Sequence, residues 1–179
     1  MAVVGRRFKD CDGCKLITDL LKKQRKHATD HPNLIYNFSN LVKIIAVNPD
    51  AQGLFVEAGM PDVLMQELED THPPLSELSI YETASALANI AATARNAHEI
   101  AIKTSGLGRI VALINLQKRL DHADASEDEI AALASLIKVM WNLTDDPEIH
   151  DECFEQRVPL RAPEHLRRDI ANRLGTMLK

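Results

Sequence analysis

The sequence is poor in aromatic residues, cysteine and long apolar runs. Phe, Trp and Tyr together make up 4% of its 179 residues. Because aromatic and β-branched residues favour strands, this scarcity, together with abundant Ala and Leu, predicts helices rather than a β-sandwich or barrel. No apolar run approaches the roughly 18–20 residues that span a bilayer, so we expect no membrane partner. The opening MAVVGRRFKD also lacks the apolar stretch of a secretory signal.

Three cysteines, an odd number, do not make a disulfide framework, which favours a reducing compartment and a cytoplasmic location. Apolar residues account for 45% of the chain and charged residues for 26%. These proportions are typical of a globular, soluble protein. The length suits one domain or a short stack of repeats.

Charge is distributed unevenly around a formal net charge of −5. The ends, residues 1–30 and 157–179, each carry an excess of four basic residues, whereas residues 50–100 contain nine acids and the single base Arg95. An acidic middle makes nucleic acid an unsuitable partner. The basic ends are typical of solvated helix faces.

Three glycines recur at nearly equal spacing, because Gly13, Gly59 and Gly106 lie 46 and 47 residues apart. Each precedes an apolar pattern of helical period. A second helix is predicted in step with the first, over 33–47, 77–93 and 128–144, and a third, shorter one over 50–58, 96–105 and 147–156. The glycines fall between helices, where a positive φ often ends a helix. The repeating unit is therefore three helices long.

The period lies in the range of armadillo and HEAT repeats, and the stretch A-x-A-L-x-N-I-A around Asn89 resembles the armadillo consensus. This resemblance implies an all-α fold, a right-handed α-solenoid of about three armadillo-type (HEAT-like) repeats. We expect one domain over 1–179, with repeat junctions near 13, 59, 106 and 158 and a capping helix over 161–179. At the last junction the sequence reads Arg157-Val158-Pro159, a departure from the glycine pattern.

In armadillo proteins the position that matches Asn89 and Asn142 often carries an asparagine that binds the backbone of a ligand. An amide can donate and accept at once, so it suits an extended peptide. Lys43 occupies this position in the first repeat. Alternatively, both asparagines are polar residues that close a helix end. The tryptophan that accompanies this asparagine in nuclear-import receptors is replaced by Ser39, Ser85 and Lys138, which argues against a groove for nuclear-localisation signals.

The segment W-N-L-T-D, residues 141–145, resembles a stretch in the cullin ubiquitin-ligase receptors that recognise an N-terminal glycine. The resemblance implies that Trp141, Asn142 and Asp145 help to hold a free amino end. The carboxylate would pair with the ammonium group of that amino end, and the indole would line the pocket. Alternatively, Trp141 packs within the core or between repeats.

One further spacing, Cys11-x2-Cys14-x12-His27-x3-His31, matches a zinc site with two cysteines and two histidines. The interval also fits a repeat helix with Thr18 and Gln24 where a zinc finger has apolar residues, so packing is the favoured interpretation. No phosphate loop, nucleophile elbow or converging acid and base is found. We therefore expect no cofactor and no enzyme.

These observations predict a non-catalytic protein-interaction module that binds an extended peptide or a partner helix. The expected binding residues are Lys43, Ser85, Asn89, Trp141, Asn142 and Asp145. Two alternatives remain open. One is a regulatory module, either a ubiquitin-ligase receptor or a regulator of a small GTPase, and the other is a structural subunit of a larger complex or parent chain.

Overall fold

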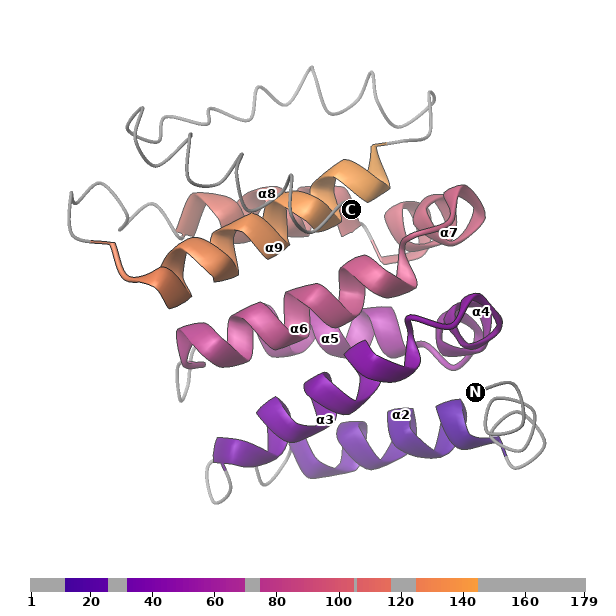
Figure 1. The fold of residues 1–179 in the computed structure, drawn as a ribbon. Coiled ribbons are helices and arrows are strands. Elements are labelled where there is room, and N and C mark those ends of the chain that lie inside the picture. Colours follow the sequence, from indigo (N-terminus) through magenta and orange to yellow (C-terminus); the bar gives the residue numbers. More distant parts are fainter. Residues whose placement is uncertain (1–11, 26–31, 70–74, 105, 117–124, 145–179) are drawn as a thin grey trace.

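A computed structural model of the chain describes residues 12–25, 32–69, 75–104, 106–116 and 125–144. These residues form helices and short connections without a strand, which confirms the all-α prediction for the described part (Figure 1). The helices are α2 (Gly13–Gln24), α3 (Pro32–Ile45), α4 (Pro49–Glu57), α5 (Met60–Glu69), α6 (Glu77–Ile90), α7 (Ala94–Thr104), α8 (Gly106–Leu116) and α9 (Glu127–Leu143). None of them is both long and apolar enough to cross a membrane. The expected helix over 147–156, the junction near 158 and the capping helix over 161–179 lie outside the described residues.

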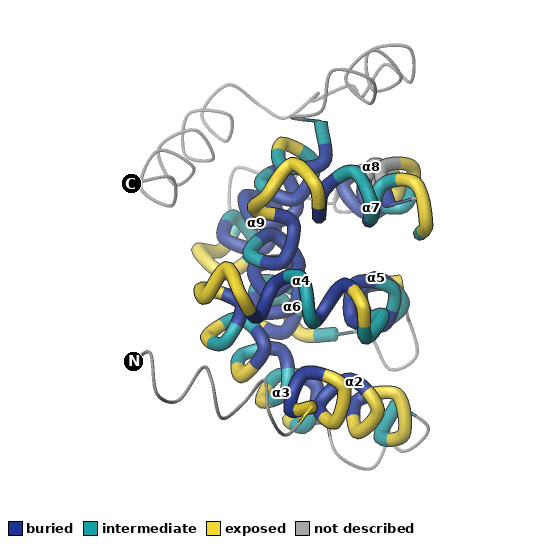
Figure 2. Tube along the Cα trace, turned by 90° about the vertical axis from the view of Figure 1, so that its right-hand side faces the viewer, coloured by how far each residue is buried: buried dark blue, intermediate teal, exposed yellow. Residues whose placement is uncertain are grey.

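The helices stack in three layers (Figure 1). The first layer holds α2 and α3, the second holds α4, α5 and α6, and the third holds α7, α8 and α9. Helices at the same place in successive layers pack directly on one another. Hence α3, α6 and α9 form one row, which we call the long-helix row, and α2, α5 and α8 form a second, which we call the back row (Figure 2).

Local sequence signals explain where several helices begin. The side chain of Ser126 accepts from the backbone N–H of Glu129, and the Glu129 carboxylate accepts from the Ser126 N–H, which completes a capping box. Ser76 caps α6 in a similar way by accepting from the Ser79 N–H. Asn48 caps α4, whose first residue is Pro49. Proline is tolerated there because the N–H at this position has no partner within the helix.

The core lies between the two rows, and the short helices α4 and α7 also contribute buried residues to it (Figure 2). Its largest fully buried side chains are Phe55, Leu21, Met60, Leu64, Met65, Leu87, Ile90, Ile100, Ile110, Leu136 and Leu143. Alanine fills several buried positions of α6, namely Ala84, Ala86 and Ala88. Such small side chains let the neighbouring long helices approach closely.

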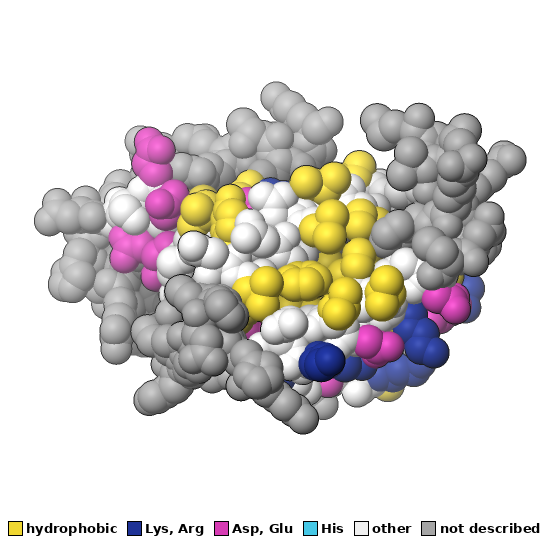
Figure 3. Space-filling model, turned by 90° about the horizontal axis from the view of Figure 1, so that it is seen from below, with side chains coloured by type: hydrophobic (Ala, Val, Ile, Leu, Met, Phe, Trp, Pro, Cys, Tyr) yellow, Lys and Arg dark blue, Asp and Glu magenta, His cyan; other side chains and the backbone are white. Residues whose placement is uncertain are grey.

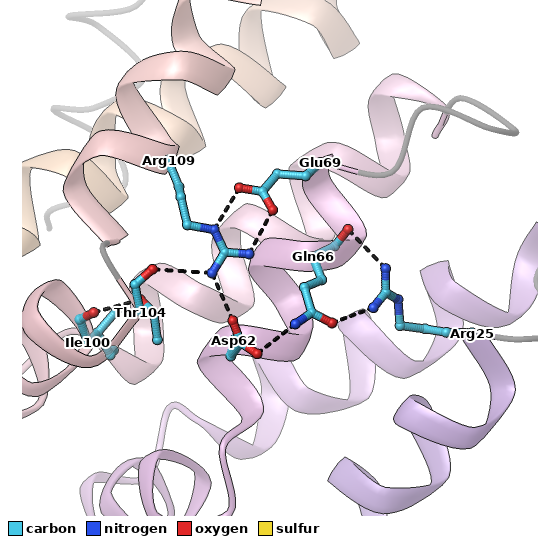
Figure 4. Close-up of polar contacts among 7 residues, drawn as sticks. All are labelled: Arg25, Asp62, Gln66, Glu69, Ile100, Thr104 and Arg109. Atoms are coloured by element: carbon cyan, nitrogen blue, oxygen red, sulfur yellow. Dashed lines mark hydrogen bonds and ion pairs between the residues drawn. The ribbon is translucent and has the colours of Figure 1, made fainter.

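Polar side chains link all three layers of the back row (Figure 4). Arg109 of α8 donates two hydrogen bonds, of 2.6 and 2.7 Å, to Glu69 of α5, and one of 2.8 Å to Asp62. From the first layer, Arg25 donates to Gln66 of α5 at 2.5 Å. The hydrogen bonds to Glu69 raise the pKa of Arg109 above its ordinary value. A two-pronged arginine–carboxylate pair fixes geometry as well as charge, so this network sets the register of the back row.

The three junction glycines serve different purposes. Gly59 has a φ of 76°, as expected for a residue that ends a helix in the left-handed region. Gly13 is the first residue of α2, and it is the preceding Asp12 that has a positive φ, of 50°. Gly106 begins α8 in close contact with its neighbours. A Cβ there would lie 3.0 Å from Thr104 Oγ1, 3.2 Å from the Ile100 carbonyl oxygen and 3.2 Å from Met65 Cε. The prediction of a positive φ therefore holds at Gly59 and is wrong at Gly13 and Gly106. At the first of these junctions the left-handed residue is the preceding Asp12, and at Gly106 close packing requires glycine.

Two glycines of α8 provide a matched test of this packing. We expect Gly106→Ala to lower the free energy of unfolding by about 1–3 kcal/mol, since its Cβ must displace backbone and core atoms. Gly108→Ala should raise it by about 0.5–1 kcal/mol, because no atom lies within 4 Å of its new Cβ and alanine favours a helix. Urea unfolding followed by circular dichroism measures both. Equal effects of the two substitutions would contradict the close approach at Gly106.

Candidate protein-binding face

The candidate site begins with the carbonyl groups at the ends of the long helices. The last four carbonyls of a helix have no partner within it. Near the end of α3, the Lys43 carbonyl accepts a hydrogen bond of 3.0 Å from the Asn89 side chain in the next layer. Near the end of α6, the Ala88 carbonyl accepts one of 2.8 Å from Asn142 in α9. Both predicted ligand-binding asparagines thus cap the preceding long helix with their amide N–H groups.

A second amide caps each of the same helix ends. Gln52 of α4 donates to the Ala46 carbonyl at 3.0 Å, and Asn96 of α7 donates to the Ile90 carbonyl at 3.1 Å. Both donors are buried and stand six residues after their acceptors. The C-terminal ends of α3 and α6 are therefore closed by the same arrangement, one amide from the following short helix and one from the following long helix.

Hydroxyl pairs join the middles of the long helices. Ser39 of α3 lies 2.9 Å from Thr83 of α6, and Ser85 of α6 lies 3.1 Å from Ser135 of α9, measured between hydroxyl oxygens. All four residues are buried. Ser85, a predicted binding residue, therefore lies between α6 and α9 and contributes to their contact.

Lys43 lies where α3 meets α6. Its ammonium is 2.5 Å from the buried Glu82 carboxylate and 5.2 Å from the centre of the Tyr81 ring. The Lys43 side chain is 25% exposed. Leu78, one turn before Tyr81, is also exposed. Sequence reasoning missed Tyr81 and Leu78, although Tyr81 stands four residues before Ser85 and eight before Asn89, on one side of the helix.

Trp141 is a surface residue, with 62% of its area exposed. The equivalent positions in α3 and α6 hold Val42 and Ala88, and both are fully buried between layers. Its indole therefore lies on the side of α9 that would continue the stack, whereas Asn142 faces back toward α6. Asp145 lies outside the described residues. The structure thus places Asn89 against the Lys43 backbone and Asn142 against the Ala88 backbone. Ser85 is taken up by its contact with Ser135 of α9.

Of the four predicted zinc ligands, only Cys14 is among the described residues. Its thiol is buried and donates to the Ala51 carbonyl at 3.9 Å. Burial raises the pKa of Cys14 to about 11, so in this environment the thiol is favoured over the reactive thiolate at neutral pH. Within the described residues no three His, Cys, Asp or Glu side chains gather to hold a metal ion. Cys11, His27 and His31 lie outside them.

Comparisons with protein-family models, with curated proteins and with solved structures gave no match to this chain. The chemistry of the face therefore has to be inferred from its own residues. The face offers a cation, a phenol ring, an indole and the edges of two amides. Such groups can bind a polypeptide by hydrogen bonds and apolar contact.

The amide caps predict a stability effect that differs from a loss of ligand binding. We expect Asn142→Ala to lower the free energy of unfolding by about 1–3 kcal/mol, because the Ala88 carbonyl loses its partner in a half-buried place. Asn37→Ala, at an exposed position of α3, is the control and should change it by less than about 0.5 kcal/mol. Urea titrations of both variants measure the difference. If Asn142→Ala unfolds at the wild-type urea concentration, the cap contributes nothing.

Acidic side chains meet where α6 and α9 begin. Burial raises the pKa of Glu77, and the neighbouring charges of Glu129 and Asp128 raise it further. The Glu77 Oε2 atom is buried and has no hydrogen-bond partner among the described residues. The folded chain therefore holds this proton more tightly than the unfolded chain does. Stability from this group is present below its unfolded pKa and is lost as pH rises through the folded pKa.

This sign predicts that Glu77→Gln stabilises the protein at neutral pH but not in acid. At pH 7 the variant should have the higher Tm, because it removes a partly buried charge beside two like charges. At about pH 4 or below, where the carboxyl is protonated, the two proteins should melt together. Glu127→Gln, at an exposed position at the start of α9, is the control. A Glu77→Gln effect that is equal at both pH values would exclude the electrostatic cause.

Proposed function

We propose that this chain is a non-catalytic protein-interaction module built from armadillo-type repeats. The observation that carries the proposal is the repeated closure of α3 and α6 by amides of the next layer, Asn89 and Asn142 among them. Equivalent contacts in successive layers are what a repeat architecture requires, since each repeat touches only its neighbours. Stacked repeats of this kind offer an extended surface for a partner.

The distribution of ionisable groups also supports a binding role over catalysis. Catalysis needs an acid, base or nucleophile aimed into a cleft. Several described ion pairs instead join one layer to the next, among them Arg109 with Asp62 and Glu69, and Lys43 with Glu82. The Cys14 thiol is buried, and burial raises its pKa to about 11. These groups hold the stack together and leave its surface for recognition.

We place the partner, an extended peptide or a helix, along the long-helix row. Lys43 and Tyr81 form one contact region at the junction of α3 and α6. Trp141 forms a second at the far end of the row, on the side of α9 that faces away from α6, where a large exposed aromatic side chain is suited to anchor a partner. Asn89 and Asn142 lie between these regions, half-buried, and their main task is to cap helices.

Capture experiments with matched variants test this placement. Tagged wild type, Tyr81→Ala and Trp141→Ala are compared with Ile102→Ala, whose side chain on α7 is as exposed as Trp141, at 63% against 62%. We expect partners recovered with wild type to fall about tenfold or more in the first two variants, since hot-spot aromatics contribute about 2 kcal/mol or more. Ile102→Ala should retain them. Circular dichroism of each variant checks its folding, and a partner set unaffected by Tyr81→Ala and Trp141→Ala would refute binding on the long-helix row.

A further inference from the structure

One cation of the long-helix row lacks the partner that comparable cations of this fold have. Among the described residues, the half-buried lysines and arginines are Arg25, Lys43, Arg109 and Lys138. The first three each pair with a carboxylate of another layer. Lys138 makes no hydrogen bond and no ion pair within the described part of the chain. The fold therefore supplies a counter-charge to its other partly buried cations and leaves this one without it.

Lys138 lies on α9 among residues of the proposed binding face. It stands three residues before Trp141 and four before Asn142, so the three side chains are neighbours on the surface of the helix. Asn142 faces back toward α6 and Trp141 faces away from it, which leaves Lys138 between them. Ser85 holds the corresponding place in α6, and its hydroxyl contacts Ser135 of α9. The last described layer thus has an unpaired ammonium group where the preceding layer has an engaged hydroxyl.

Partial burial is unfavourable for an ammonium group without a counter-charge. Burial lowers the pKa of Lys138 below its ordinary value, because it takes the charged form partly out of water. A carboxylate beside the ammonium offsets this loss of hydration and adds a charge-assisted hydrogen bond. A partner that brings a carboxylate to Lys138 breaks no existing ion pair. Lys43 differs in this respect, since Glu82 already neutralises it.

The surrounding charges favour one carboxylate over an acidic run or a phosphate group. Glu77 feels the charges of Glu129 and Asp128 where α6 and α9 begin, so this end of the two helices is acidic. The whole chain carries a net charge of −5. Both would repel a strongly acidic partner. The exposed indole of Trp141, beside Lys138, suits an apolar side chain next to the single acid.

We propose that Lys138 and Trp141 together select a partner segment in which an Asp or Glu side chain stands beside an apolar residue. The carboxylate accepts a hydrogen bond from the Lys138 ammonium, and the apolar side chain packs against the Trp141 indole. This inference rests on the proposed protein-interaction function and specifies the chemistry of the partner.

Selection from random peptides displayed on phage tests this chemistry with the full chain. We expect peptides recovered on wild type to be enriched in Asp or Glu next to an aromatic or aliphatic residue. Lys138→Met should lose the acidic preference, and Lys138→Glu should replace it by a preference for Lys or Arg, because the charge of the site is reversed. Lys23→Glu makes the same change at an exposed position of α2, in the first layer, and should keep the wild-type preference.

A synthetic peptide from this selection then gives the affinities. Replacing its acidic residue by the corresponding amide should weaken binding to wild type about tenfold or more, because the buried charge pair is lost. The same replacement should change binding to Lys138→Met by less than about twofold, which completes a double-mutant cycle. Isothermal titration calorimetry measures the four affinities. Circular dichroism checks that the variants are helical, and the comparison of the two peptides on wild type does not depend on any variant.

The opposite end of the stack needs a control of its own, because its surface could also bind peptides. Figure 3 shows hydrophobic side chains gathered across this end. The exposed ones on α2 and α3 include Leu16, Leu41 and Ile44. Peptides that bind there should be lost on Ile44→Glu and kept on Lys138→Met. The two variants therefore separate binding at the first layer from binding at α9.

Three outcomes would overturn the proposal. Selected peptides without an acidic preference would refute the carboxylate and leave the protein-interaction function intact. An acidic preference that survives in Lys138→Met would assign the carboxylate to another cation. If wild type selects no peptide at all, the proposed function fails and this inference fails with it.

Discussion

The stack depends on how the final carbonyl groups of each long helix find hydrogen-bond donors. A helix end buried against a neighbour cannot leave these groups to water, and an unpaired buried carbonyl costs about 1–3 kcal/mol. Here, side-chain amides supply the donors, two for each of α3 and α6. One amide comes from the short helix that follows and one from the next long helix. Together, the two amides therefore join the end of a long helix to both the short helix and the long helix of the following layer.

This requirement also explains the spacing of the repeats. The asparagine that caps a carbonyl one layer back must lie about one repeat later in the chain, and Asn89 follows Lys43 by 46 residues. The third repeat has extra polar residues in the interval 121–128, and Asn142 follows Ala88 by 54 residues. The extra length precedes α9, so Asn142 still reaches the carbonyl. Hydroxyl pairs and alanines in the middle of the row then permit a close approach between the long helices.

The candidate site was only partly predictable from sequence. The armadillo resemblance singled out Asn89, Asn142 and Lys43 because their positions correspond, and the structure brings Lys43 and Asn89 together. Pattern alone could not show that the amide N–H of each asparagine is already engaged by a backbone carbonyl. Ser85 is buried because Ser135 lies opposite, in a helix 50 residues further on. The contact between Lys43 and the ring of Tyr81 likewise joins residues that no local motif connects.

The sequence by itself determined the helices, their order and their three-layer recurrence, because helical periodicity, caps and glycine spacing act over short distances along the chain. The glycine spacing marked the helix junctions but not which glycine takes a positive φ, since of the three only Gly59 does. The tertiary structure alone decided which side of each helix is covered. Leu41 and Leu87 occupy the same position of the repeat, yet Leu87 is fully buried and Leu41 is 43% exposed. The reason is physical: burial depends on whether another layer packs against that side, and a helix at the end of a stack has a described neighbour on one side only.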